Sequence, residues 1–163
     1  MRPTPLPAAA GQESVWDYPR PPRVERTPEL VVVTLGDAPV ATTTDAVRVL
    51  ETSHPPVYYL PCGAFEPGVL EAAGGASVCE FKGVAAYVSV RAHGRLLSRV
   101  GWTYPAPLPG YEILADRVAL YAGDLQCTVD GELVQPQEGG FYGGWITSRV
   151  VGPFKGSPGT LGW

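Results

Sequence analysis

Glycine and proline interrupt this chain throughout, and no other feature restricts its fold as strongly. The chain has 20 glycines and 18 prolines among its 163 residues. Both residue types break helices and mark turns, so the segments between them favour many short strands over long helices. The length fits a single domain. Because 45% of the residues are hydrophobic and only 17% are charged, we expect a packed globule.

Two hairpins are the clearest local structures in the sequence. Residues 84–104 alternate apolar and polar side chains on either side of a His-Gly turn. Residues 126–135 contain an Asp-Gly turn, which is the strongest short-range hairpin pattern in the chain. An apolar run of β-branched residues at 30–35 (LVVVTL), followed by a turn, predicts a further strand pair.

Helical structure is expected only in short pieces. Residues 65–74 (FEPGVLEAAG) form the best candidate for a short helix, which would end at glycine. Residues 45–52 fit either a strand or a short helical turn, and residues 111–123 begin as a helical turn and continue as strand. Together these patterns predict a mostly-β fold, an antiparallel sandwich or open barrel with one or two short helices and extended proline-rich termini.

The composition along the chain suggests three parts. Residues 1–28 contain seven prolines and are expected to form an extended arm without regular structure, residues 29–156 a single β domain, and residues 157–163 a C-terminal tail. The arm carries Trp16 and Tyr18, which suggests that it lies on a surface of its own domain or of a partner. The alternative is a frayed tail.

Charge and hydropathy exclude several classes of partner. The formal net charge is -4, and the 12 basic residues form no cluster, so we expect no nucleic-acid surface. No apolar run approaches the roughly 20 residues of a membrane span, and we expect no membrane insertion. The first residues lack the apolar stretch of a secretory signal, and the expected location is therefore cytoplasmic.

The sequence indicates neither a metal site nor a cofactor. The three cysteines are widely spaced and form no C-x-x-C pair, which argues against structural zinc and against a disulfide framework. His54, Glu51 and the cysteines would be the available metal ligands, but His93 belongs to a hairpin turn, which leaves too few. The glycine-rich stretch GFYGGW matches neither phosphate-binding loop pattern. The cysteines are Cys62, Cys79 and Cys127.

The segment ETSHPP is the densest in chemically active side chains. Ser53 and His54 are adjacent, so in an extended chain they point apart and do not form a nucleophile with its base. Pro55-Pro56 could hold His54 rigidly toward a cleft, where His54 and Glu51 would act as general acid and base. The alternative is a structural histidine bonded to a backbone carbonyl.

The segment CEFKG offers a thiol and an amine. If it turns, Cys79 and Lys82 approach each other and the ammonium lowers the pKa of the thiol; if it is extended, they lie on opposite faces. Lys82 and Lys155 are the only lysines of the chain. Lys82 could bind an anion or act as an amine nucleophile. The alternative is a buried Cys79 beside an exposed Lys82.

Aromatic residues form the third candidate feature. Trp102 and Tyr104 share one face of a strand, and with other tyrosines they could wall a small-molecule pocket. The alternative is an ordinary β core. The predicted substrate-binding residues are Ser53, Tyr58, Tyr87, Trp102, Tyr104 and Tyr121.

Six motifs in order carry a family resemblance, and they extend over nearly the whole chain. They are VWDYPRPPR, VLETSHPPVYYLP, CEFKG-x-A-x-Y, WTYPAPLPGYE, CTVDGE and GGFYGGWITSRVVGPFKG. In these motifs the chain resembles the domain of unknown function 427 family, which implies a small mostly-β domain. Phe81 and Val88 stand where the family often has Trp. The motif positions map onto Glu51, Ser53, His54, Pro55, Tyr58, Cys79, Lys82, Gly83, Tyr87, Trp102, Tyr104 and Pro105.

Three functions are consistent with these features. The first is a binding domain or a cofactor-independent enzyme for a small organic molecule, with an aromatic-lined pocket that uses His54, Glu51 and Lys82. The second is a structural or interaction module, a homodimer held by the aromatic arm and the C-terminal LGW. The third is a nucleotidyltransferase, a label that the resembled family carries.

Overall fold

The computed structural model describes residues 2–163. Their regular secondary structure is almost entirely strand, and helical structure occurs only as three short 3₁₀ turns. The strands are β1 (Glu13–Ser14), β2 (Arg23–Thr27), β3 (Val31–Leu35), β4 (Ala38–Thr43), β5 (Ala46–Leu50), β6 (Val57–Pro61), β7 (Leu70–Cys79), β8 (Gly83–Ala92), β9 (Arg95–Thr103), β10 (Arg117–Leu120), β11 (Leu125–Val129), β12 (Glu132–Leu133), β13 (Gln135–Pro136), β14 (Trp145–Ile146) and β15 (Val150–Val151). The 3₁₀ turns are η1 (Val15–Asp17), η2 (Cys62–Ala64) and η3 (Glu112–Leu114).

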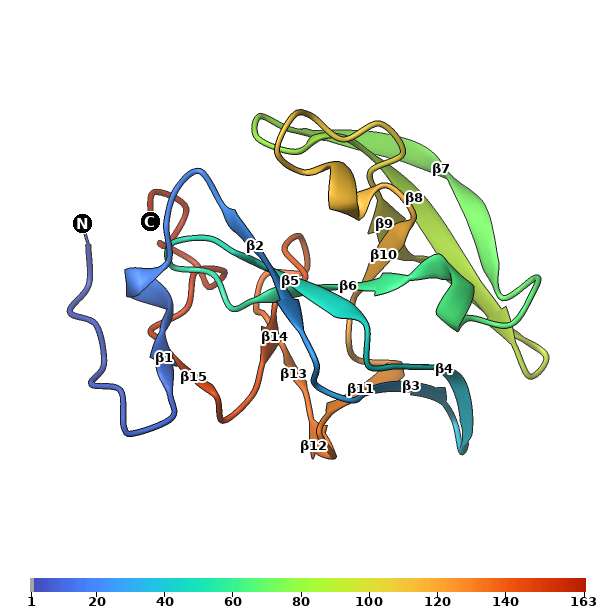
Figure 1. The fold of residues 1–163 in the computed structure, drawn as a ribbon, viewed down its shortest axis with the longest axis horizontal. Coiled ribbons are helices and arrows are strands. Elements are labelled where there is room, and N and C mark those ends of the chain that lie inside the picture. The colour runs from blue at the N-terminus through green and yellow to red at the C-terminus, as the bar shows by residue number, and fades with distance from the viewer. Residues whose placement is uncertain (1) are drawn as a thin grey trace.

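Two antiparallel sheets form the body of the molecule (Figure 1). The larger sheet has seven strands in the order β2-β5-β6-β10-β9-β8-β7, and the smaller has four in the order β12-β11-β3-β4. Short pairs β1-β15 and β13-β14 complete the fold, and the β1-β15 pair is parallel. The regular structure is mostly β, and the antiparallel sheets do not close into a barrel. The prediction of a mostly-β fold with antiparallel sheets is therefore confirmed.

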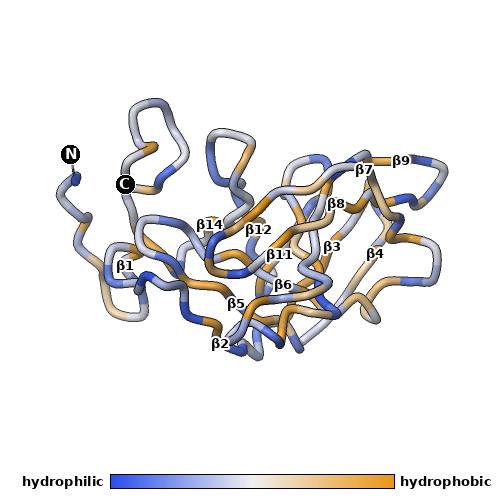
Figure 2. The backbone as a smooth tube through the Cα atoms, turned by 90° about the horizontal axis from the view of Figure 1, so that it is seen from above, coloured by the Kyte–Doolittle hydropathy of each residue, from blue (hydrophilic) through white to orange (hydrophobic). Residues whose placement is uncertain are grey.

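Each face of the larger sheet carries an apolar cluster. Side chains that alternate along β6 and β10 divide between two apolar clusters. Tyr58, Leu60 and Leu120 pack toward the smaller sheet, in the core of a sandwich. Tyr59 and Ala119 point to the opposite face. In Figure 2 the strongly hydrophobic stretches follow strands such as β3, β5 and β11, whereas the hydrophilic stretches lie mainly in the connecting loops.

Most of the predicted strands are confirmed, and one predicted helix is wrong. The hairpins β8-β9 and β11-β12 form as predicted, with turns at residues 93–94 and 130–131. The expected helix at 65–74 is instead a turn followed by β7, which pairs with β8 along most of its length. Gly68 has a φ of 84°, which ends any helix there, and the long-range ladder with β8 then outweighs a weak local preference.

Residues 2–28 pack on the domain and contain two short strands and a 3₁₀ turn, contrary to the expectation of an arm without regular structure. Strand β2 forms an edge of the larger sheet through its pairing with β5. Val15 and Trp16 are buried in a third apolar cluster with Leu50 and Val150, against which Trp163 packs. The prolines therefore do not keep this segment apart, because its aromatic and aliphatic side chains find partners within the same chain.

A buried guanidinium ties the N-terminal segment to the larger sheet. Arg48 of β5 is fully buried and donates two hydrogen bonds to Glu13, at 2.9 and 3.2 Å, and another to Glu25. Glu13 also accepts from Tyr18 and forms an ion pair with Arg149. Burial acts to raise the pKa of Glu13, but the hydrogen bonds from Arg48 and Tyr18 prevail and lower it to about 2.

Candidate functional site

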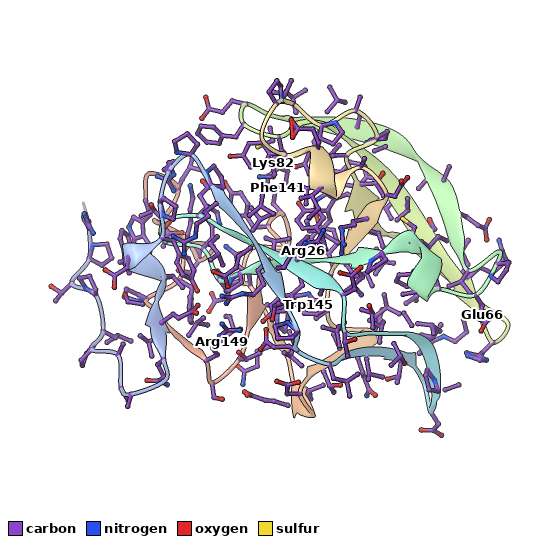
Figure 3. The ribbon with its side chains drawn as sticks, in the orientation of Figure 1. Arg26, Glu66, Lys82, Phe141, Trp145 and Arg149 are labelled. Carbon is purple, nitrogen blue, oxygen red and sulfur yellow. The ribbon has the colours of Figure 1, made fainter. Side chains whose placement is uncertain are left out.

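A cleft of about 570 Å³ opens on the face of the larger sheet that the smaller sheet does not cover. Its floor is formed by strands β5, β6, β8 and β9, and its walls by the β7–β8 turn and by residues 141–143, Lys155 and Trp163. Figure 3 shows Lys82 and Phe141 on this side of the molecule and Trp145, which belongs to the sandwich core, on the other.

The structure brings most of the sequence-predicted site residues together in this one cleft. They come from four separate segments of the chain: the turn after β5, the β7–β8 hairpin, the end of β9 and the residue after β10. Ser53 and Tyr58 are the two predicted residues that do not line it. Those that do are Glu51, His54, Cys79, Lys82, Tyr87, Trp102, Tyr104 and Tyr121.

Tyr58 belongs to the sandwich core and not to the cleft. Its ring stacks on Trp145 with a centroid distance of 5.1 Å, and its hydroxyl donates to Glu29 at 2.9 Å. The neighbouring Tyr59 takes the place in the cleft that we expected for Tyr58. The segment VYYLP places two tyrosines in the same sequence context, so alternation alone could not decide which of them faces the cleft.

Ser53 is fully buried beneath the turn that carries His54. It adopts a φ of 73°, its N–H donates to the Val15 carbonyl, and its carbonyl accepts from the Lys155 N–H. Its Oγ is buried and has no hydrogen-bond partner in the described chain. Ser53 thus shapes the turn between β5 and β6 and does not face a ligand.

His54 is held in one orientation by a glutamine. The Gln137 amide is fixed because its Oε1 accepts from the Gly144 N–H at 3.0 Å and its Nε2 donates to the Lys155 carbonyl at 2.7 Å. The same Nε2 lies 3.2 Å from Nδ1 of His54, so Nδ1 must be the acceptor and the imidazole proton resides on Nε2. The His54 and Tyr142 rings also pack in a T-shaped arrangement, with their centroids 4.7 Å apart.

This environment keeps His54 neutral. Burial, together with the positive charges of Lys155, Arg20 and Lys82, lowers the pKa of His54 to about 3. A second proton on Nδ1 would also point at the Gln137 amide, which offers only N–H groups there. His54 therefore presents an uncharged Nε2–H to the cleft.

Glu51 lies near that Nε2–H but is held by another partner. Its Oε2 is 3.7 Å from His54 Nε2, which is too long for a hydrogen bond. The same oxygen accepts from Arg20 Nε at 3.1 Å. Arg20 in turn donates to the Thr52 carbonyl at 2.8 Å, and the Arg20–Glu51 pair lines the cleft beside His54.

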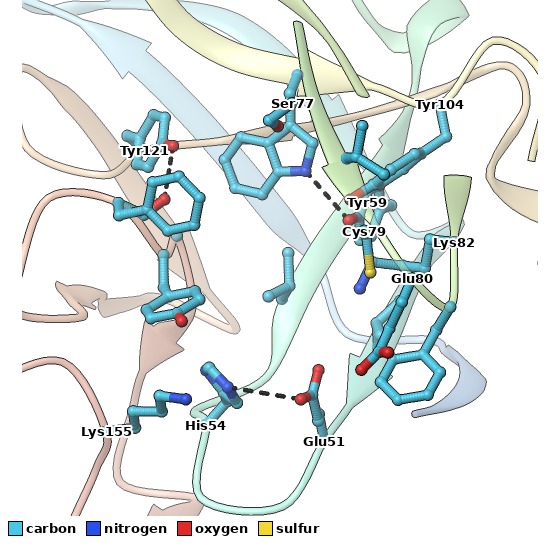
Figure 4. A pocket seen from close by; sticks show the side chains of 18 of the residues that line it. Glu51, His54, Tyr59, Ser77, Cys79, Glu80, Lys82, Tyr104, Tyr121 and Lys155 are labelled. Carbon is cyan, nitrogen blue, oxygen red and sulfur yellow. Dashed lines mark hydrogen bonds and ion pairs between the residues drawn. The ribbon is translucent and has the colours of Figure 1, made fainter. Parts of the chain in front are cut away.

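Both lysines of the chain line the cleft, and each lies over an aromatic ring. Lys82 Nζ is 5.8 Å from the Tyr104 ring centroid, and Lys155 Nζ is 5.4 Å from that of Tyr142. No Asp or Glu side chain within residues 2–163 forms an ion pair with either lysine. Lys155 also donates to the main-chain oxygen of Trp163 at 3.4 Å. Figure 4 shows Lys155 beside His54 on one side of the cleft and Lys82 near Tyr104 on the other.

The aromatic wall contains a chain of polar contacts. Trp102 Nε1 donates to the Tyr59 hydroxyl at 3.2 Å, and the Tyr59 and Tyr104 rings pack with their centroids 6.3 Å apart. Burial raises the pKa of Tyr59 and of Tyr104 well above the ordinary value, so both stay protonated. The Tyr121 ring packs beside Trp102 with a centroid distance of 4.8 Å, and its hydroxyl donates to the Phe141 carbonyl at 2.8 Å, which fixes the loop that carries Tyr142.

The glycine pair within GFYGGW allows this loop to approach the sheet. A Cβ at Gly143 would lie 2.2 Å from Cη2 of Trp102, and one at Gly144 would lie 2.5 Å from the Pro55 carbonyl oxygen. Glycine is therefore required at both positions for close packing and not for phosphate binding. The loop closes one side of the cleft only because these two residues have no side chain.

Cys79 and Lys82 meet the cleft from the same turn. Cys79 ends β7, is half-buried and is a free thiol, as is Cys62. Cys127 is buried in the sandwich core, where burial raises its pKa to about 12. Residues 2–163 contain no group of three or more His, Cys, Asp or Glu side chains placed to hold a metal ion. No helix in the same range is long and apolar enough to cross a membrane.

Several cleft residues were missed because only the folded chain brings them near His54. Arg20 comes from the N-terminal segment, and Lys155 and Trp163 from the C-terminal one. Gln137 and Tyr142 stand in segments that the sequence marks as turns and irregular structure. The positions of all five relative to His54 depend on long-range packing, which no local pattern reports.

Comparison with known proteins identifies a family but no characterised relative. None of the curated proteins matches the chain. A family model described as a domain of unknown function (DUF427), with the short name NTP_transf_9, matches residues 23–135. The match extends from β2 to the first residue of β13 and contains most of the cleft. It covers more than half of the chain, and the chain therefore belongs to the DUF427 family.

Proposed function

We propose that the cleft binds a small organic molecule that carries an anionic group on a flat apolar body. The observation that carries this proposal is the placement of the only two lysines of the chain in one aromatic cleft, where no Asp or Glu side chain of the described residues pairs with either of them. An ammonium that is half-buried and unpaired gains most when an anion enters.

The dimensions and lining of the cleft fit such a ligand. Its volume of about 570 Å³ lies within the range of small-molecule sites. Aromatic rings line it on several sides and would stack on a planar body. The one carboxylate of the cleft without an ion-pair partner in the described chain, that of Glu80, belongs to an exposed residue, so water screens its repulsion of an anion. The aromatic lining residues are Tyr59, Phe81, Tyr87, Trp102, Tyr104, Tyr121, Phe141, Tyr142 and Trp163.

His54 serves this function as a hydrogen-bond donor. The lone pair of Nδ1 is engaged by Gln137, and the Nε2–H faces the cleft. Glu51 is engaged by Arg20. Since neither group is free to take a proton from a ligand, the geometry supports binding better than the acid–base chemistry expected for His54 and Glu51.

The two alternative functions lack a comparable observation. Trp16 and Tyr18, whose presence suggested a dimer clamp, are both buried against their own chain. Sedimentation of the full chain and of a chain lacking residues 1–28 would test the homodimer. Nucleotidyl transfer typically uses carboxylates that hold Mg²⁺, and the cleft offers only Glu51, which Arg20 engages, and the exposed Glu80.

A thermal-shift screen of small organic acids, amines and neutral compounds tests the proposal. We expect stabilisation by acids with a flat apolar body, because a ligand that binds only the folded state raises the melting temperature. Lys82→Met and Lys155→Met should each reduce the shift. Arg95→Met, which removes an exposed cation at the tip of the β8–β9 hairpin, should leave it unchanged. Shifts caused equally by amines, or insensitive to both lysine variants, would contradict the proposal.

A further inference from the structure

The cleft contains two separate groups of hydrogen-bond donors, and their placement restricts the ligand beyond the presence of one anion. This inference rests on the proposed function. One group comprises His54 and Lys155, which both contact the Tyr142 ring. The other comprises Tyr104 and Lys82, whose ammonium lies over the Tyr104 ring. Figure 4 shows the two groups on opposite sides of the cleft.

In the first group, the direction of the histidine hydrogen bond is fixed by backbone groups. Gln137 cannot rotate its amide without losing bonds to the Gly144 N–H and the Lys155 carbonyl. Its amide nitrogen must therefore face Nδ1 of His54 at 3.2 Å. As a consequence Nε2 always carries a proton, and a ligand atom that meets it must be an acceptor.

In the second group, the donor beside the ammonium is a tyrosine hydroxyl. Tyr104 packs near Tyr59 with ring centroids 6.3 Å apart, and the Tyr59 oxygen accepts from Trp102 at 3.2 Å, because an indole N–H can only donate. Burial raises the pKa of Tyr104 well above its ordinary value, so the Tyr104 hydroxyl keeps its proton. This hydroxyl can therefore donate to an acceptor in the cleft.

Each group thus combines one neutral donor with one ammonium. Both lysines are half-buried, and no Asp or Glu side chain of the described chain pairs with either of them, whereas Lys155 Nζ lies 3.4 Å from the main-chain oxygen of Trp163. Arg20, the third cation of the cleft, is already paired with Glu51 at 3.1 Å. A neutral donor beside an ammonium suits a carboxylate, whose two oxygens can accept from both.

We propose that the cleft is built for a flat dicarboxylate, with one carboxylate at His54 and Lys155, the other at Tyr104 and Lys82, and the planar body between the aromatic walls. A monocarboxylate satisfies one group and leaves the other ammonium without a partner. A neutral diamide can accept from both groups but gains nothing from either charge. The affinities of three matched compounds should therefore differ.

Titration calorimetry with naphthalene-2,6-dicarboxylate, 2-naphthoate and naphthalene-2,6-dicarboxamide tests this assignment. We expect the dicarboxylate to bind at least about tenfold more tightly than the monocarboxylate, because a hydrogen bond to a charged group contributes at least that factor. The diamide should bind most weakly. Terephthalate serves as a shorter second dicarboxylate, so that a mismatch in length does not decide the result.

Variants at each end complete the test. Lys82→Met and Lys155→Met should each lower the dicarboxylate affinity about tenfold, toward that of 2-naphthoate in the unmodified protein. Arg95→Met should leave all affinities unchanged, and unchanged melting temperatures of the free variants will show that they are folded.

The outcomes separate the two proposals. If both dicarboxylates bind no more tightly than 2-naphthoate, but 2-naphthoate binds and depends on a lysine, the two-ended ligand is wrong and the anion cleft stands. If the diamide equals the dicarboxylates, the charge requirement is wrong as well. If none of the compounds binds, the proposed function fails and the dicarboxylate with it.

Discussion

The two faces of the seven-stranded sheet are built from the same strands but have different roles. On the sandwich face, side chains of β3 and β11 fill the space above β6 and β10, and the result is a closed apolar core. On the other face, aromatic side chains leave a cleft of about 570 Å³ with two ammonium groups that no Asp or Glu side chain of the described residues pairs with. Alternation along each strand therefore separates residues that stabilise the fold from residues available to a ligand.

Tyr58 and Tyr59 show this division at adjacent positions. Both are almost fully buried and both keep their hydroxyl protons. Tyr58 stacks on Trp145 in the core and donates to Glu29, whereas Tyr59 accepts from Trp102 at the cleft. Burial alone therefore does not distinguish a core residue from a site residue, and the identity of the hydrogen-bond partners does.

Truncation of the core face should produce the largest loss of stability. Leu60→Ala removes a side chain that is 1% exposed in the sandwich, and we expect a loss of about 2–5 kcal/mol in the free energy of unfolding. Val57→Ala, on the cleft face of the same strand and half-buried, should cost about 1 kcal/mol. Urea denaturation measures both. Equal losses would show that the cleft face is as tightly packed as the core.

A methyl group added to the loop at Gly143 should damage the cleft more selectively. Its Cβ would lie 2.2 Å from Trp102, so the Gly143→Ala variant must displace the indole and weaken its bond to Tyr59. We expect a cost of about 1–3 kcal/mol together with weaker 2-naphthoate binding. Gly63→Ala is the matched control, because nothing lies within 4 Å of its added Cβ. Unchanged binding in Gly143→Ala would place the ligand elsewhere.

Acid should weaken the fold through His54 before it does so through Glu13. The pKa of His54 is about 3 in the folded protein, whereas the ordinary value of 6.5 applies in the unfolded chain. The unfolded chain therefore binds more protons, and the free energy of unfolding falls as the pH drops below 6.5. The slope reaches at most about 1.4 kcal/mol per pH unit. Glu13, whose pKa falls from 4.5 to about 2, acts in the same direction only below pH 4.5.

The window between pH 6.5 and 4.5 therefore isolates the histidine. In a His93→Asn background, where His54 is the only histidine, the further change His54→Asn should flatten the stability profile in that window. The Asn side chain can still accept from Gln137. Melting temperatures measured across the window check this, and an unaltered slope would mean that His54 is not the group responsible.

The sequence predicts the local elements of this fold well and the closure of the cleft poorly. The hairpins at residues 84–104 and 126–135 depend on turns that Gly and Asp encode locally, and both form. Lys82 and Trp102 lie within or beside these elements, and they line the cleft as expected. The helix expected at residues 65–74 failed because pairing with β8 is a long-range effect.

The residues that control His54 were beyond local analysis for the same reason. Gln137 is 83 positions away from His54 in the chain, and the N- and C-terminal segments that supply Arg20 and Lys155 are brought together by the β1-β15 pairing and by packing around Trp16. The aromatic residues of the proline-rich segment suggested that it lies on a surface of its own domain or of a partner. Which surface depended on side chains more than a hundred residues further along, such as Val150 and Trp163.

The protonation of His54 is the most direct test of the claim that this histidine offers a ligand only a hydrogen-bond donor. Nitrogen-15 NMR of the His93→Asn protein across the pH range reports which ring nitrogen carries the proton and where the ring gains a second one. We predict a proton on Nε2 and a neutral ring from pH 7 down to about 4, since the pKa is about 3. A proton on Nδ1, or a titration midpoint near the ordinary pKa of 6.5, would contradict the account.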